Sequence, residues 1–322
     1  MKQDIFTSFV RRHQLFEPSL IDALAIHEEE SDYSLILESI FKIWSGPKHD
    51  VFFSSHKSLD RYPLNDLTLA DQGLHVARHI FANYEHAKHT KPLNETIYAT
   101  EFETTREKFD SEGLIIIENF LDGAMRSLHT TQLNEVAPSV NKQSGNMFTK
   151  TIPGLRTIVE NCIGGSASPY LETNTFYQVI ENVEDDNDEQ KDYHYDTFFP
   201  ALKFWWFPED VHVEQGPLVY VKNSPLMTNA KLDWIYEQTC AVLDSTWDRS
   251  RRRGHPEGSL RVSEDELFLM DLHACPVPVE ANTLVIGNVG GFHGRGNVVG
   301  KHTRRAIHGS VRVDAPFKHA ST

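Results

Sequence analysis

Four triplets of the form His-x-Asp/Glu occur in the sequence, a pairing of side chains that can bind divalent metals. With 17 histidines and 46 carboxylates, about two such triplets would arise by chance, so the pattern alone indicates little. The triplets are His27/Glu29, His194/Asp196, His212/Glu214 and His255/Glu257. The first, third and fourth stand in what we expect to be a solvated helix end, a turn between strands and a basic loop. We therefore expect structural or surface roles for these three.

His194 and Asp196 lie between expected strands over residues 173–180 and 202–207, among aromatic residues. In an extended segment, positions i and i+2 point to the same face, so these two side chains can reach one metal ion together. A non-haem iron(II) site takes two imidazoles and one carboxylate on one octahedral face. It leaves three positions for oxygen and a chelating co-substrate. The third protein ligand must therefore come from elsewhere in the chain.

His293, in the segment GGFHGRGN, is the expected third ligand. It follows an expected strand over residues 283–287, and a distant strand of a jelly roll can supply such a ligand. The glycines around it let backbone and ligands approach closely. His302 and His308 are alternatives on the next loop and strand. The ligand set alone is also compatible with manganese or zinc.

The elements that must position these residues are mostly short strands separated by Gly, Pro or acidic turns, which is typical of a β-sandwich or barrel. Strands are expected over residues 114–117, 173–180, 202–207, 217–221, 283–287 and 304–313. A helix that ends at Gly113 precedes the first strand, and a long helix is expected over 229–252. The acidic run 181–192, directly before the metal triplet, is expected to be a solvated loop.

Residues 1–100 show helical rather than alternating periodicity. Leu37, Ile40, Phe41 and Trp44 lie at i, i+3, i+4 and i+7, on one face of a helix. A second helix is expected over residues 69–84. We therefore expect residues 1–100 to form a helical N-terminal layer or cap packed on a core domain over 101–322.

Composition excludes several classes of protein. The net charge of −15 and pI near 5.5 argue against a nucleic-acid partner. Three widely spaced cysteines argue against a disulfide framework or a thiolate zinc site. The N-terminus has no apolar signal region, and the longest apolar stretch, around residues 114–117, is far shorter than a bilayer span. We expect a cytoplasmic protein that does not associate with membranes.

The string HYDTFFPALKFWWFPEDVHVEQGPLVYVKNSP, with the later ANTLVIGNVGGFHGRGN and HTRRAIHGSVR, resembles the phytanoyl-CoA dioxygenase-like group of iron(II)/2-oxoglutarate oxygenases. The earlier segment FDSEGLIIIENFLD is also similar to that group. The resemblance covers residues 105–315 and leaves out residues 1–100. It implies a mainly β fold with helical additions around a double-stranded β-helix, the jelly-roll or cupin-like core. The segment KNSP departs from the Gly-Ser-His turn that many members have.

Residue by residue, the resemblance makes His194, Asp196 and His293 the iron ligands. Arg304, eleven residues beyond His293, matches the arginine that receives the far carboxylate of 2-oxoglutarate. A guanidinium suits this task because its planar donors grip a carboxylate in two places. The adjacent Arg305 must face the other way on a strand.

Six further residues are candidates for the site. For each of them, a role in packing or on the surface is at least as well supported. Gln178 and Lys203 are candidates for the co-substrate pocket, and Thr197 for orienting Asp196. Trp205, Arg295 and Tyr195 are candidates for the substrate side, with Arg295 suited to an acidic substrate group.

The resemblance implies a non-haem iron(II)-dependent dioxygenase that uses 2-oxoglutarate and O2 and hydroxylates a small-molecule substrate, releasing succinate and CO2. The carboxylate of Asp196 argues against the halogenating relatives, which keep that position vacant for halide. One alternative is a non-catalytic jelly-roll protein that binds a small molecule. Another is a cupin-like metalloenzyme without 2-oxoglutarate, which would have no need of Arg304. Neither the substrate nor the oligomeric state follows from the sequence.

Overall fold

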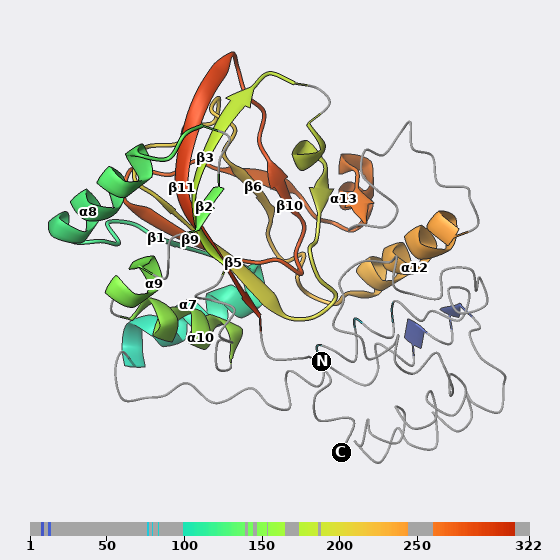
Figure 1. Ribbon diagram of the computed structural model, residues 1–322. Helices are drawn as coiled ribbons and strands as arrows, with labels where there is room; N and C mark the ends of the chain where they lie inside the picture. Colours follow the sequence, from blue (N-terminus) through green and yellow to red (C-terminus); the bar gives the residue numbers. More distant parts are fainter. Residues whose placement is uncertain are drawn as a thin grey trace, which may run out of the picture. The chain divides into compact units, whose positions relative to one another are not determined.

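The computed structural model describes residues 99–138, 141–143, 147–152, 154–164, 174–185, 188–243 and 260–312, with seven single positions before residue 84 (Figure 1). The helix expected around residues 37–44 and the triplets at His27 and His255 lie outside these residues. Of the helix expected over 69–84, the described residues Val76, His79 and Asn83 are helical. A separate helical layer over residues 1–100 stays a prediction.

The chain divides into two compact units. One comprises Met1–Lys88, Met227–Leu260 and Ala315–Thr322, and it contains helix α12 (Asn229–Leu243). The other comprises His89–Leu226 and Arg261–Asp314, and it contains every described strand. The metal candidates therefore all belong to the second unit.

The second unit is built on two antiparallel sheets, which form a jelly-roll core. The larger sheet has the order β1 (Leu114–Ile117), β9 (Thr283–Asn288), β5 (Ala201–Phe207), β11 (Lys301–Arg312), β3 (Thr175–Val183) and β2 (Asn141–Gln143). The smaller sheet has the order β7 (Arg261–Val262), β4 (Tyr193–His194), β10 (His293–Arg295), β6 (Leu218–Val221) and β8 (Ala274–Val277). The mainly β fold with helical additions is confirmed.

Four helices lie on the side of the larger sheet that faces away from β6 and β10 (Figure 1). They are α7 (Ala99–Glu112), α8 (Gly123–Asn134), α9 (Met147–Thr151) and α10 (Leu155–Ile163). Helix α7 ends where expected, because Gly113 takes a left-handed conformation (φ 79°) and its N–H bonds to the Phe109 carbonyl. Asp122 caps the start of helix α8, because its side chain accepts from the Met125 N–H.

Two further short helices flank the smaller sheet: the 3-10 turn η2 (Glu189–Lys191) and helix α13 (Glu264–Leu269). Ser263 and Glu266 form a reciprocal capping box at the start of α13. No helix within the described residues is both long and apolar enough to cross a bilayer.

The larger sheet has two faces of different character, because alternate residues of a strand point to opposite sides. On the helix side, Phe204 and Trp206 of β5 and Ile307 of β11 are fully buried against the helices. On the side that faces the smaller sheet, Lys203 and Trp205 point inward instead. The inward face carries a second hydrophobic core, which includes Phe207, Val285 and Ala306, beside the polar side chains of the pocket.

Most strand predictions are confirmed to within a few residues, and one expectation needs correction. The acidic run is not wholly a loop: residues 181–183 continue β3, and residues 189–191 form η2. His293 lies on a strand of its own, β10, as a ligand supplied by a distant strand requires. The long helix is described only as far as Leu243.

Candidate metal centre

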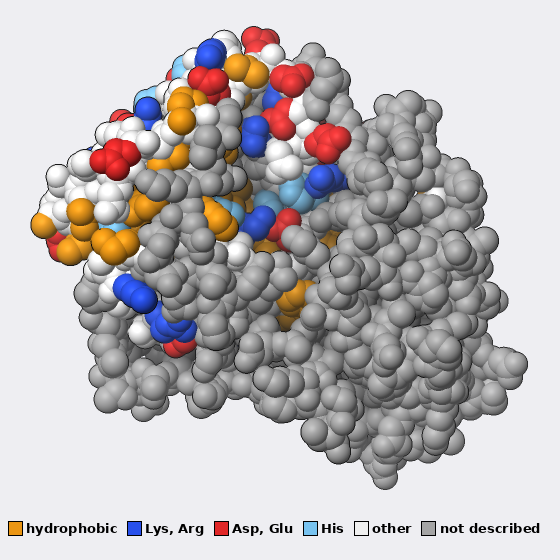
Figure 2. All heavy atoms as spheres, viewed as in Figure 1, with side chains coloured by type: hydrophobic (Ala, Val, Ile, Leu, Met, Phe, Trp, Pro, Cys, Tyr) orange, Lys and Arg blue, Asp and Glu red, His pale blue; other side chains and the backbone are white. Residues whose placement is uncertain are grey.

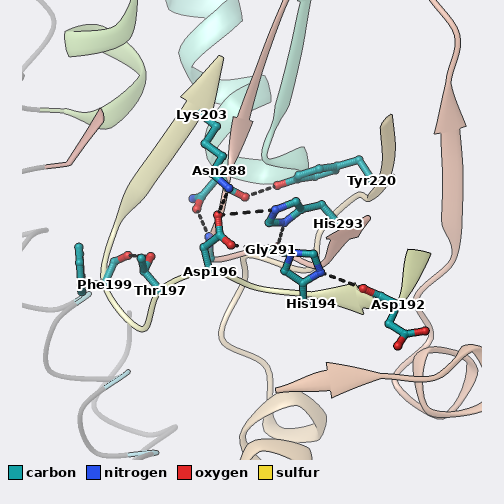
Figure 3. Close-up of polar contacts among 11 residues, drawn as sticks. Asp192, His194, Asp196, Thr197, Phe199, Lys203, Tyr220, Asn288, Gly291 and His293 are labelled. Carbon is teal, nitrogen blue, oxygen red and sulfur yellow. Dashed lines mark hydrogen bonds and ion pairs between the residues drawn. The ribbon is translucent and has the colours of Figure 1, made fainter. Parts of the chain in front are cut away.

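His194, Asp196 and His293 come together at one end of the space between the two sheets (Figure 3). Each offers one ligand atom, and the three atoms lie within 4.8 Å of one another. Asp196 places Oδ1 3.8 Å from Nε2 of His194 and Oδ2 3.7 Å from Nε2 of His293. Two imidazole nitrogens and one carboxylate are a donor set for a divalent first-row metal.

Backbone pairing creates this convergence. Strand β4 pairs with β10 so that His194 and His293 are direct cross-strand partners, and their rings lie 4.7 Å apart between centroids. Asp196 follows in the bend after β4, where its backbone N–H donates to the Val289 carbonyl at 2.7 Å. The carboxylate is thereby returned to the face that carries the two rings.

Both imidazoles have their tautomer set by the backbone. Nδ1 of His194 donates to the Asp192 carbonyl at 2.8 Å, and Nδ1 of His293 donates to the Gly291 carbonyl at 3.0 Å. Each Nε2 therefore keeps its lone pair, and both Nε2 atoms are directed at Asp196. Hydrogen bonds of this kind orient metal-binding histidines in general.

The charge states favour metal binding at neutral pH. Burial, reinforced by the neighbouring His293, lowers the pKa of His194 to about 3. Burial also lowers the pKa of His293, although Asp196 opposes the shift. Both rings are therefore neutral, as a metal ligand must be.

Asp196 is held as a carboxylate by a direct ion pair with Lys203, whose side chain lies on the inward face of β5. Burial alone would raise the pKa of Asp196. The charged Lys203 ammonium is the main influence that opposes burial, and the pKa lies below the usual range of a carboxyl group. Lys203 was predicted to line the co-substrate pocket. Its contact with Asp196 could not be predicted, because the contact depends on the bend at residues 196–200.

The backbone around His293 is packed too closely for larger residues at two glycines. A Cβ on Gly291 would lie 2.7 Å from the Tyr220 hydroxyl, and one on Gly296 would lie 2.9 Å from Pro217. The segment KNSP also supports this strand, because Ser224 accepts a 2.7 Å hydrogen bond from the Phe292 N–H. The segment KNSP therefore contacts the backbone beside the candidate ligand His293.

A pocket of about 150 Å³ is lined by His194 and His293, but not by Asp196, and runs along the inward face of the larger sheet. Figure 2 shows histidine, basic and acidic side chains beside one another near the middle of the molecular surface in that view. Five of the predicted site residues outside the triad line the pocket, namely Gln178, Lys203, Trp205, Arg295 and Arg304.

Arg304 and Arg305 face opposite sides of β11, as strand alternation predicts. Arg304 lines the pocket, and its Nη1 donates to the Gly216 carbonyl. Burial lowers the pKa of Arg304 to about 10, which leaves it charged at neutral pH. Arg305 pairs with Glu209 at 3.5 Å and is not among the lining residues.

Arg295 lines the pocket already paired with an acidic residue of the protein. Its Nη1 lies 2.7 Å from Oδ2 of Asp188, while Oδ1 of Asp188 accepts from the Gln190 N–H at the start of η2. Part of the acidic run therefore ties η2 to the strand that carries His293. Arg295 has one partner before any substrate arrives.

Two predicted site residues lie elsewhere. Thr197 is buried, and its hydroxyl donates to the Phe199 carbonyl at 2.7 Å, so it does not hold Asp196 (Figure 3). Tyr195 is buried beside Phe292, with ring centroids 6.0 Å apart, and does not line the pocket. Tyr195 lies between two ligands that share a face, so alternation turns it the other way.

Sequence reasoning missed several lining residues. Ile180, Gln190, Phe207 and Leu218 contribute to the walls. His308, considered only as an alternative ligand, lines the pocket outside the ligand cluster. Because His308 lies four positions after Arg304 on one strand, alternation predicts that both side chains point to the same face. His302 lies outside the pocket and hydrogen-bonds to the Val299 carbonyl.

No protein-family model matches the sequence, and no curated protein is similar to it in sequence. The epimerase SnoN, solved with Fe3+, alpha ketoglutarate and nogalamycin RO, is similar in structure with a TM-score of 0.45 and 16% identity, over 66% of this chain and 83% of that one. EctD from S. alaskensis, solved with 2-oxoglutarate and 5-hydroxyectoine, has a TM-score of 0.43 and 11% identity, over 69% and 81% of the two chains. HygX from Streptomyces hygroscopicus, solved with iron bound, has a TM-score of 0.36 and 14% identity, over 64% and 85%.

Proposed function

We propose that this chain is a non-haem iron(II)- and 2-oxoglutarate-dependent dioxygenase that hydroxylates a small-molecule substrate. The observation that carries the proposal is one pocket with two different anchors. Neutral imidazoles and a carboxylate gather at one end, and the charged Arg304 lines the same pocket from β11. A metal-chelating dicarboxylate needs both anchors at once.

The three ligand groups fit iron(II) by type and by charge state. His194 and His293 would donate Nε2, and Asp196 would donate a carboxylate oxygen. His194 and His293 line the pocket, where further metal ligands would bind. When bound, iron(II) would supply the activation of O2 that is coupled to conversion of 2-oxoglutarate into succinate and CO2.

Arg304 would receive the far carboxylate of 2-oxoglutarate. Its Nη1 is committed to the Gly216 carbonyl, which fixes the direction of the side chain and leaves the other guanidinium donors for a ligand. A charged guanidinium that lines a pocket gives a bidentate carboxylate a favourable partner. This anchor distinguishes the proposal from a cupin-like metalloenzyme that does not use 2-oxoglutarate.

The remaining walls would bind and orient the substrate. Trp205, Phe207 and Leu218 supply apolar surface, while Gln178 and Gln190 supply amide groups. Because Arg295 is already neutralised by Asp188, the walls favour a substrate with polar and apolar parts over a strongly charged one.

The test is an anaerobic titration of the protein with iron(II) and then 2-oxoglutarate. We expect the weak visible charge-transfer band of a 2-oxo acid chelated to iron(II), and slow release of succinate once air is admitted. Asp196→Ala should abolish most of the band because it removes one of three ligands. The control is Asp233→Ala, which changes a carboxylate in the other unit. A wild-type protein that stays colourless and forms no succinate would contradict the proposal.

A further inference from the structure

His308 lines the pocket without serving as one of the three candidate metal ligands. Its ring stacks on Trp205, with centroids 5.6 Å apart and an interplanar angle of 28°. Among the residues that the structure describes, none forms a hydrogen bond with either of its ring nitrogens. A polar ring is therefore held in a fixed plane at the pocket wall with its hydrogen-bonding capacity unused.

The strand register places His308 toward the metal end of the pocket. It is the direct partner of Trp205, and Lys203, the next inward residue of β5, contacts the ligand Asp196. Arg304 lies four positions earlier on β11, about 13 Å away between Cα atoms at roughly 3.3 Å per residue. A ligand stretched from the metal ligands toward Arg304 must pass His308.

The local charges keep this imidazole neutral. Burial lowers the pKa of His308 to about 3. The nearby Lys203 and Arg304 act in the same direction, and Asp196 opposes them. A neutral imidazole offers one N–H donor and one acceptor. The neighbouring Lys203 ammonium is paired with Asp196, so His308 is an available donor at this position of the wall.

We propose that His308 donates a hydrogen bond to the metal-end carboxylate of the bound 2-oxo acid. The inference rests on the proposed function and adds a third contact to the metal and Arg304. His308 is a positioning residue for the co-substrate. Its hydrogen bond would fix the orientation of the metal-end carboxylate in the pocket. Stacking on Trp205 supplies the rigidity that such positioning needs.

The experiment compares co-substrate binding to iron(II)-loaded protein without oxygen, read from the charge-transfer band. His308→Leu should raise the Kd for 2-oxoglutarate about tenfold or more, because a hydrogen bond to a charged group is lost. His308→Gln keeps an N–H donor and should recover part of the affinity. The matched control is His302→Leu, on the same strand but outside the pocket, which should bind as wild type does.

A second titration decides which end of the ligand His308 contacts. 2-Oxovalerate keeps the metal-end carboxylate and lacks the far one, so its binding should be weakened by His308→Leu and unaffected by Arg304→Ala. Thermal melts of each variant exclude misfolding as the cause.

The outcomes separate the two proposals. If wild-type protein forms the band and His308→Leu binds both 2-oxo acids as wild type does, the role of His308 is refuted and the proposed function stands. If His308→Leu weakens only 2-oxoglutarate, the metal-end contact is refuted. If wild-type protein forms no band, the proposed function fails and the inference fails with it.

Discussion

At the scale of single residues, the Asp196 carboxylate faces His194 through one oxygen and His293 through the other, while Lys203 contacts the second oxygen. A buried carboxylate without a partner would be costly, and Lys203 compensates its charge before any metal binds. The lysine therefore keeps Asp196 ionised in the absence of metal. The adjacent arginines Arg304 and Arg305 of β11 point to opposite faces, so only Arg304 lines the pocket.

Arg304→Ala should raise the KM for 2-oxoglutarate by about 10- to 100-fold, because charge-assisted hydrogen bonds of about 1.5–3 kcal/mol are lost. Arg305→Ala should leave the KM within about twofold, because its exposed pair with Glu209 contributes little and lies on the other face. Succinate release at varied 2-oxoglutarate measures both. The reverse ranking would assign the anchor to Arg305.

At the scale of elements, the site depends on two strands that are too short for periodicity to reveal. The strand over residues 114–117 was predicted with its observed bounds, because a β-branched run is bounded by Gly113. Strands β4 and β10 have two and three residues, which no alternation pattern can identify. The triad could be named from residue types and motif order. The cross-strand pairing that joins the two histidines could not, because it depends on non-local hydrogen bonds.

Gly291→Ala tests whether the close packing behind β10 holds His293 in place. The added Cβ would lie 2.7 Å from the Tyr220 hydroxyl and 2.8 Å from Pro225, so the segment must shift at a cost of about 1–3 kcal/mol. Because the Gly291 carbonyl accepts from His293, the shift should also weaken metal binding.

Gly123→Ala is the matched control for Gly291→Ala, because nothing lies within 4 Å of its added Cβ. Metal affinity by isothermal titration and unfolding in urea measure the two effects. If Gly291→Ala has the metal affinity and the free energy of unfolding of the wild type, the close packing behind β10 does not hold His293 in place.

At the scale of the whole molecule, the outward face of the larger sheet packs one hydrophobic core, and the inward face carries both a second core and the site. Helices cover the outward side chains of β5 and β11, and the inward side chains of the same strands line the pocket. Strand alternation therefore predicts which of Arg304 and Arg305 lines the pocket. It does not predict the Asp188–Arg295 pair, which joins positions 107 residues apart. A further consequence of this layout is that several histidines are buried in their neutral form.

The stability of the metal-free protein should fall as pH is lowered from 6.5 toward 5. Burial lowers the pKa of His129, on the helix side, and brings that of His308, in the pocket, to about 3. Below pH 6.5 these histidines bind protons in the unfolded chain but stay neutral in the folded protein. Lowering the pH therefore favours unfolding. Each such histidine contributes a slope of about 1.4 kcal/mol per pH unit. Urea unfolding with chelator at pH 7, 6 and 5 measures the trend, and His308→Gln should make it shallower. A free energy of unfolding that stays constant over this range would show that these rings protonate in the folded protein.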